Sequence, residues 1–292
     1  MTDQAASLRV IRGEGREPTT TLRRRERAIA VTGGKGGVGK STIAIGLAAA
    51  YARDGSRTLM VDADFGMADL NLLLGVAPTL SLLDALDGTP IEDVVVTAHG
   101  IALLPALNGS YALAMMSGAA RRRTLELVEQ LSRRFDTIVL DVAAGIGATQ
   151  ATFAAAAADT VVVVNPEPLS MADAYACLKV LAGHHGVRHA FVVPNRVTSQ
   201  AQADDIVGRL VTLVSRFLDI HLTPLPPVPC DPAVSESAHR GVPLLCHRPD
   251  APAARGIVRV ARALDALAAP DARTDSTRSF WRRHITASGE TP

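Results

Sequence analysis

The chain carries the glycine-rich stretch GGKGGVGKST at residues 33–42, which contains the pattern G-x-x-x-x-G-K-[ST]. Hydrophobic residues at 28–31 predict a short buried strand before it, and the composition of residues 41–53 predicts a helix after it. The pattern binds phosphate groups when it lies at such a strand-to-helix turn. We therefore predict a nucleotide site here, and a glycine-rich turn that binds nothing is the alternative.

Glycine suits this loop because it tolerates positive φ angles and lets backbone N–H groups approach a polyphosphate at a helix start, where the helix dipole favours negative charge. We expect Lys40 to reach the β- and γ-phosphates, the Ser41 hydroxyl to bind Mg²⁺ and the Thr42 hydroxyl to contact the α-phosphate. The predicted nucleotide-binding residues of the loop are Gly34, Gly36, Gly37, Val38, Gly39, Lys40, Ser41 and Thr42.

A second lysine, Lys35, lies inside the loop. It sits beside the predicted phosphates, at a position from which its own backbone does not easily bring the ammonium group inward. A solvated surface lysine is the alternative interpretation.

Composition limits the classes of function. The 292 residues are 48% hydrophobic, enough for the core of one large α/β domain, and the net charge of +1 provides no overall field for coating nucleic acid. The three cysteines are widely spaced, which favours small buried side chains in a reducing cytosol over a disulfide framework or metal cluster. Neither a signal peptide nor a membrane span is recognisable, so we predict a cytosolic protein, at most peripheral to a membrane.

The chain divides into a polar arm at 1–27, a core at 28–268 and a polar tail at 269–292. Its strand-like runs are continuously hydrophobic, which predicts a mostly parallel twisted sheet flanked by helices, the α/β fold of P-loop nucleotide hydrolases. Such sheets bind ligands at the carboxyl ends of their strands. We expect strands at 28–32, 58–62, 101–105, 137–141, 160–165, 189–194 and 220–223, and helices at 41–53, 113–134, 169–182, 203–218 and 251–268.

Acidic residues follow two of the predicted strands. Asp62 and Asp64, in the sequence DAD, are suited to bind Mg²⁺ through water or to hold the attacking water that hydrolysis of a γ-phosphate requires. Asp141 ends the run IVLD, which resembles a Walker B aspartate, and the small residues at 142–147 suit a segment that moves when γ-phosphate leaves. The alternatives are an exposed turn for the first pair and a capping aspartate for Asp141.

Two further residues are predicted to contact the base. The Asn195 amide, in the sequence VPNR, can donate to and accept from a purine edge. Asp231, in PCDP, is placed to line the other side of the base pocket. Asparagine after a strand is also a common turn former. The histidines show no metal-binding spacing.

With these motifs in place, the chain resembles the deviant Walker A ATPases, the group that includes MinD, ParA and the nitrogenase iron protein. Within that group it resembles the flagellar number regulators of the FlhG, FleN or YlxH type. The most discriminating segment is NPEPLSMADAYACLKVL at 165–181, because its D-A-Y-x-x-x-K-V-L pattern has no generic chemical reason. The other matching segments are 35–42, 62–75, 141–147 and 229–243, so the resemblance spans nearly the whole core.

The resemblance implies a slow, Mg²⁺-dependent ATP hydrolase that converts from monomer to homodimer when it binds ATP. Lys35 would reach the nucleotide of the facing subunit, and Asp64 would position the water. Val142 departs from the family, where Ser or Thr is usual, and this removes a hydroxyl from the segment expected to switch. The implied catalytic residues are Lys35, Lys40 and Asp64, and the implied metal ligands are Ser41, Asp62 and Asp141.

Partners follow from the same resemblance. Residues 3–9, DQAASLR, resemble the segment through which FlhG proteins stimulate the GTPase FlhF, and flagellar switch-ring proteins and a flagellar transcription activator are further implied partners. At 279–285, the sequence SFWRRHI would form a short amphipathic helix that places aromatic side chains in a membrane surface and two arginines on anionic lipid. A disordered arm and a frayed terminus are the alternatives.

Two rival functions share parts of the pattern. A ParA- or MinD-type partition or division-site positioning ATPase would use the same loop, but partition needs a basic stripe for nonspecific DNA, and we expect no specific nucleic acid here. A scaffold that holds nucleotide without hydrolysing it would need no water-positioning carboxylate. We predict instead a regulator whose output is its choice of partner.

Overall fold

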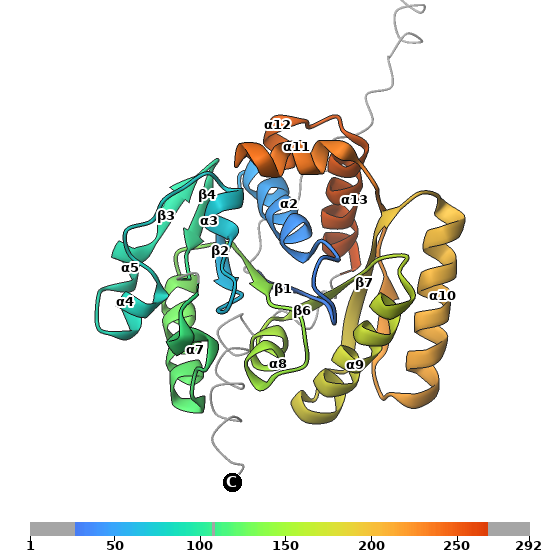
Figure 1. The fold of residues 1–292 in the computed structure, drawn as a ribbon, viewed down its shortest axis with the longest axis horizontal. Helices are drawn as coiled ribbons and strands as arrows, with labels where there is room; N and C mark the ends of the chain where they lie inside the picture. The colour runs from blue at the N-terminus through green and yellow to red at the C-terminus, as the bar shows by residue number, and fades with distance from the viewer. Residues whose placement is uncertain (1–26, 107–108, 268–292) are drawn as a thin grey trace, which may run out of the picture.

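A nine-stranded sheet forms the centre of the computed structural model, which describes residues 27–106 and 109–267 (Figure 1). Its strands run in the order β3-β4-β2-β5-β1-β6-β7-β8, and β9 pairs with β7 off this path. All pairs are parallel except β3 with β4. The predicted mostly parallel sheet is therefore confirmed. The strands are β1 (Arg27–Thr32), β2 (Thr58–Ala63), β3 (Val96–Ala98), β4 (Ile101–Leu104), β5 (Thr137–Val142), β6 (Asp159–Val164), β7 (His189–Val197), β8 (His221–Pro224) and β9 (Val228–Pro229).

Helices cover both faces of the sheet (Figure 1). One face carries α2 (Lys40–Arg53), α3 (Leu70–Leu73), α11 (Pro232–Arg240), α12 (Leu244–His247) and α13 (Pro252–Leu267). The opposite face carries α7 (Gly118–Ser132), α8 (Ala148–Ala155), α9 (Pro168–His185) and α10 (Gln200–Phe217). The short helices α4 (Leu82–Leu86), α5 (Ile91–Val94) and α6 (Tyr111–Ala114) lie in the connections around β3 and β4.

The central strand shows why the strands are continuously hydrophobic. Ile29 and Val31 of β1 belong to the cluster under α2 and α13, whereas Ala28 and Ala30 belong to the cluster under α7 and α8. Successive side chains of a strand point to opposite faces, so a sheet covered on both faces needs apolar residues at every position.

Some predicted elements were wrong in extent. The expected helix at 113–134 is two helices, because the Ser117 hydroxyl accepts a hydrogen bond from the Ala120 N–H at 3.1 Å and caps a new helix that begins at Gly118. The strand expected to end at residue 194 continues to Val197. The antiparallel strand β3 and the one-turn helices were missed, because segments this short carry little periodicity.

Arg27 joins the first described strand to the last described helix. Its guanidinium is buried and contacts Asp159 at the start of β6 and Asp265 near the end of α13, with N–O distances of 2.7 Å to each. The described core therefore begins and ends at the amino edge of the sheet. The predicted arm segment 3–9 and tail segment 279–285 lie outside the described residues, and none of the described helices is both long and apolar enough to cross a membrane.

Candidate functional site

The phosphate-loop stretch connects β1 to α2 at the carboxyl edge of the sheet. The backbone of Gly39 has a φ of 96°, and a Cβ atom there would lie 2.2 Å from Nδ2 of Asn195, so this position requires glycine. The same Nδ2 donates to the Val38 carbonyl oxygen at 2.8 Å. Strand β7 thus fixes the loop in a shape whose N–H groups precede a helix start, as anion binding needs.

Lys40 is the first residue of α2 and is buried. Its Nζ donates to the Lys35 carbonyl oxygen at 3.5 Å, so the ammonium group lies within the curve of its own loop. Ser41 and Thr42 follow in the first turn of α2 and are half-buried. The loop residues predicted from the sequence are therefore brought together, and their contacts with nucleotide stay a prediction.

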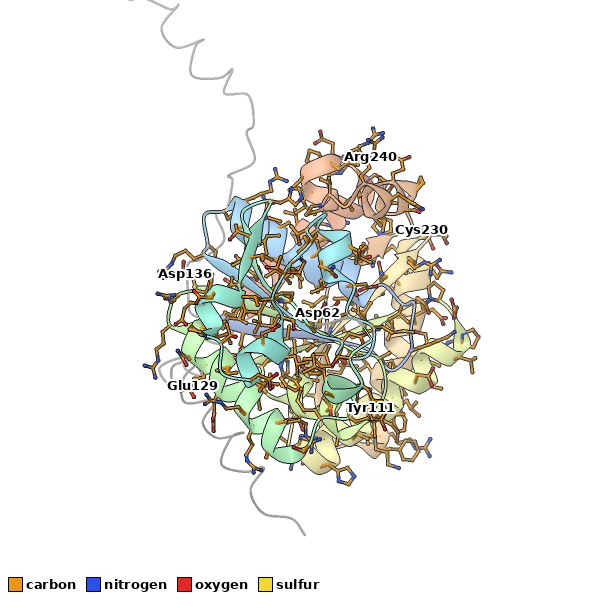
Figure 2. All side chains as sticks on the ribbon, turned by 60° about the vertical axis from the view of Figure 1, so that its left-hand side comes forward. Asp62, Tyr111, Glu129, Asp136, Cys230 and Arg240 are labelled. Carbon is orange, nitrogen blue, oxygen red and sulfur yellow. The ribbon has the colours of Figure 1, made fainter. Side chains whose placement is uncertain are left out.

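Two buried aspartates lie side by side next to the loop. Asp62 of β2 and Asp141 of β5 occupy paired positions on adjacent strands, and each is only 2% exposed. Burial, followed by the charge of Asp141, raises the pKa of Asp62. Burial raises the pKa of Asp141 to about 7, although the Ser41 hydroxyl and the Lys40 charge act in the opposite direction. Figure 2 shows Asp62 deep among the side chains of several elements.

This donor set suits Mg²⁺. Oδ1 of Asp141 is buried and has no hydrogen-bond partner within the described residues, so it is available to a ligand. Across residues 27–106 and 109–267, no three His, Cys, Asp or Glu side chains form a ready metal cage. Mg²⁺ fits such a site because it usually takes one or two carboxylates together with nucleotide phosphates and water. When bound, it would supply charge neutralisation for the phosphates.

Asp62 also shapes the loop that carries Asp64. Its Oδ1 accepts from the Asp64 N–H at 3.2 Å and its Oδ2 accepts from the Leu70 N–H at 3.4 Å. Asp64 in turn accepts from the Met67 N–H at 3.1 Å. Asp69, which the sequence did not single out, is drawn into this group: partial burial of its carboxyl group and the charge of Asp64 raise its pKa.

The two residues predicted to contact the base have structural partners of their own. Asn195 lies inside β7, so the alternative of a turn former after the strand is wrong. Oδ1 of Asp231 accepts from the Ala233 N–H at 2.9 Å and caps α11, while Oδ2 accepts from the Ala253 N–H at 3.0 Å. Contact of either side chain with a base stays a prediction.

The structure reveals one ion pair at the loop that sequence reasoning missed. Nζ of Lys35 contacts Oε2 of Glu167, which precedes α9 in the same chain. The two residues are separated by 132 positions, so no local pattern indicates the pair.

The cysteines differ from the prediction of three buried side chains. Cys177 is buried, and burial raises its pKa to about 11. Cys230 and Cys246 are exposed, because one lies in the turn between β9 and α11 and the other on the one-turn helix α12.

The parallel sheet, the glycine-rich loop before α2 and the buried carboxylates beside it define a P-loop nucleotide hydrolase. Residues 29–244 match the CobQ/CobB/MinD/ParA nucleotide binding domain, and the chain belongs to this family. It is an ATPase of the MinD/ParA type, whose nucleotide and metal are ATP and Mg²⁺.

Comparison with known proteins supports the resemblance read from the sequence. The chain is 35% identical over 214 residues to the antiactivator FleN of Pseudomonas aeruginosa, covering 73% of this chain and 76% of FleN. It is 38% identical over 184 residues to the flagellum site-determining protein YlxH of Helicobacter pylori, covering 62% of each chain. Among solved structures, MinD of Pyrococcus horikoshii complexed with Mg-ADP superposes with a TM-score of 0.69 at 25% identity, covering 83% of this chain and 97% of that one.

The pKa of Asp141 generates a prediction about stability. Burial raises the pKa of the Asp141 carboxyl group from 3.8 to about 7, so the folded protein binds this proton more tightly, and the stability present below pH 3.8 is lost as pH rises from there to about 7. Without Mg²⁺ or nucleotide, Asp141→Asn should therefore stabilise the chain by up to about 4 kcal/mol at pH 8 and much less near pH 5. Urea unfolding at both pH values measures this.

Asp250→Asn, at an exposed position on the loop before α13, is the matched control and should change stability little at either pH. A destabilised Asp141→Asn protein at pH 8 would contradict the prediction.

Proposed function

We propose that ATP pairs two copies of this ATPase face to face across the carboxyl edge of the sheet, and that the pair regulates flagellar number and placement. The flagellar role is supported by the names of two relatives, an antiactivator and a flagellum site-determining protein. The pairing is supported by what surrounds the phosphate loop.

Exposed apolar side chains gather at this edge, and this observation carries the proposal. Each lies on a segment that follows the carboxyl end of β2, β4, β5 or β6, and each is between 55% and 78% exposed. Figure 2 labels one of them, Tyr111, below the buried Asp62 in that view. An apolar surface around a charged site is typical of an interaction surface, and a second copy offers a matching one. The residues are Met67, Tyr111, Met115, Ile146 and Leu169.

The proposed reaction is slow hydrolysis of the β–γ bond. Lys40 would neutralise charge on the phosphates, Asp64 would position the attacking water, and Lys35 would reach the nucleotide of the partner copy. The N–H of Gly145, in the segment after Asp141, donates to the Gly33 carbonyl oxygen at 3.4 Å, so this segment contacts the phosphate loop. Loss of γ-phosphate would then loosen the segment and release the pair.

The two ends of the chain would carry partner binding. The described core begins at Arg27 and reaches Asp265 at the amino edge, opposite the proposed interface. An arm that stimulates the GTPase FlhF and a tail that binds anionic lipid would therefore stay accessible in the pair. Switch-ring proteins and a flagellar transcription activator are the other proposed partners, in the cytoplasm or at the inner face of the membrane or cell pole.

The mechanism predicts different behaviour for two substitutions. Asp64→Ala should reduce phosphate release by roughly 100-fold while ATP still pairs the chains, since this carboxylate acts on the water rather than on binding. Lys40→Ala should lose both hydrolysis and pairing. Light scattering with size exclusion in ATP and in ADP, together with a phosphate-release assay, measures both. Equal and negligible phosphate release by wild type and both variants would instead favour a non-hydrolysing scaffold.

The apolar edge predicts a variant that binds nucleotide but does not pair. Met115→Glu places a charge on this surface and should raise the dissociation constant of the ATP-bound dimer at least about tenfold. Binding of a fluorescent ATP analogue should be unchanged. Phe217→Glu is the matched control, because Phe217 is 60% exposed but ends α10 at the opposite edge. Equal dimerisation of the two variants would refute an interface at the carboxyl edge.

Two truncations test the roles of the ends. Removal of residues 1–9 should abolish stimulation of FlhF GTPase activity and leave ATP hydrolysis unchanged. Removal of residues 279–292 should abolish ATP-dependent flotation with liposomes that contain anionic lipid, because avidity of two tails is needed for such short segments. Liposome binding that persists without residues 279–292 would remove the tail from the proposal.

A further inference from the structure

Lys35 is held within its own subunit, on the side of the phosphate loop that faces solvent. Its Nζ pairs with Oε2 of Glu167, and the side chains are 33% and 52% exposed. This places the ammonium group beside α9 of the same chain. The pair therefore lies at the mouth of the site, where a partner copy would approach.

Hydrogen bonds with Asn165 fix the Glu167 carboxylate in place independently of Lys35. Asn165 is buried, and its Nδ2 donates to Oε1 of Glu167 at 3.1 Å, while the Glu167 N–H donates to Oδ1 of Asn165 at 3.3 Å. The Asn165 N–H in turn donates to the Ser170 hydroxyl at 3.1 Å. One oxygen of Glu167 is thus used for orientation, and the other is presented to Lys35. The hydrogen bond and charge of Lys35, followed by Asn165, lower the pKa of Glu167.

Packing fixes the distance between the two segments. A Cβ atom on Gly34 would lie 2.0 Å from the carbonyl carbon and oxygen of Asp173 in α9, so the loop backbone contacts the helix backbone with no room for a side chain. Lys35 follows this contact directly, and Glu167 precedes the same helix. The close contact between the loop backbone and the α9 backbone therefore fixes the positions from which Lys35 and Glu167 reach each other.

We propose that Glu167 is a positioning residue that retains Lys35 in its own subunit and thereby sets the protein concentration at which ATP pairs the chains. This inference rests on the proposed function, in which Lys35 crosses to the partner's nucleotide. Lys35 cannot contact both groups at once, so each copy must break its ion pair with Glu167 before the dimer closes. Arg196 limits the free-energy cost of breaking this ion pair, because its positive charge remains near Glu167 after Lys35 leaves. The guanidinium donates to the Gly37 carbonyl oxygen at 3.4 Å, and its charge contributes to the lowered pKa of Glu167.

The first experiment observes the pair directly in the nucleotide-free, full-length chain. The sequence has only three lysines, which makes amine labelling unusually simple: Lys35, the buried Lys40 and the exposed Lys179. A paired ammonium must leave its carboxylate before the nitrogen reacts with acetic anhydride. Glu167→Gln should therefore speed labelling of Lys35 by roughly two- to fivefold relative to Lys179, as expected for an exposed ion pair.

Labelling at high salt distinguishes the loss of the Lys35–Glu167 ion pair from a structural defect in the Glu167→Gln variant. Screening at about 1 M salt should speed labelling of Lys35 in the wild type and remove most of the difference from Glu167→Gln. Glu92→Gln is the matched control, since Glu92 also forms a surface ion pair, with Arg134 at 3.9 Å, but on α5, far from α2 and the loop (Figure 1). It should leave Lys35 labelling unchanged.

The second experiment measures pairing. Because each of two copies breaks one ion pair, Glu167→Gln should lower the dissociation constant of the ATP-bound dimer by the square of the single effect, roughly 4- to 25-fold, in sedimentation with ATP and Mg²⁺. Weaker or unchanged pairing of Glu167→Gln, or unchanged labelling of Lys35, would overturn the inference. A wild type that stays monomeric with ATP at every concentration would instead refute the proposed function, while the labelling result in the monomer would still report whether Glu167 holds Lys35.

Discussion

The burial of two carboxylates side by side is the constraint on which the site depends. Parallel pairing of β2 with β5 places Asp62 and Asp141 at the same level of the sheet, and burial raises the pKa of both. Buried like charges are costly unless a cation compensates them. The position of this pair, beside the start of α2, means that a nucleotide and its metal would supply that compensation and would stabilise the folded chain as they bind.

The loop beside this pair directs its two lysines to different sides. Lys40 begins α2 and its ammonium group donates to the carbonyl oxygen of Lys35, so it lies within the loop of its own chain. Lys35 extends outward and contacts Glu167, at the surface where exposed apolar side chains gather. The hydrogen bond from the Asn195 side-chain amide to the Val38 carbonyl oxygen holds the loop in this shape before any ligand arrives. The same rigidity that prepares the phosphate site therefore also prevents Lys35 from folding back into it.

The sequence predicts the parts of this structure that depend on local pattern. The loop motif fixes residues 33–42, and continuous apolar runs locate the strands because both faces of the sheet are buried. Contacts between distant segments were not predictable: Glu167 lies 132 positions from Lys35. Asp69 joins the carboxylates only because Asp62 folds the loop back on itself. Local capping was also not predicted: Ser117 caps a new helix and so divides the segment whose hydrophobic pattern predicts one amphipathic helix.

The phosphate loop and the two described ends of the chain lie at opposite edges of the sheet. Arg27 ties β1, β6 and α13 together at the amino edge, so both described ends of the chain leave from there. Breaking a buried ion pair of this kind is expensive, which keeps these ends fixed relative to the core. A dimer formed across the carboxyl edge, as proposed, would leave both described ends of the chain uncovered and would present two copies of each. In the proposed mechanism, the state of the nucleotide would then reach partners through the number of arms and tails that the pair presents together.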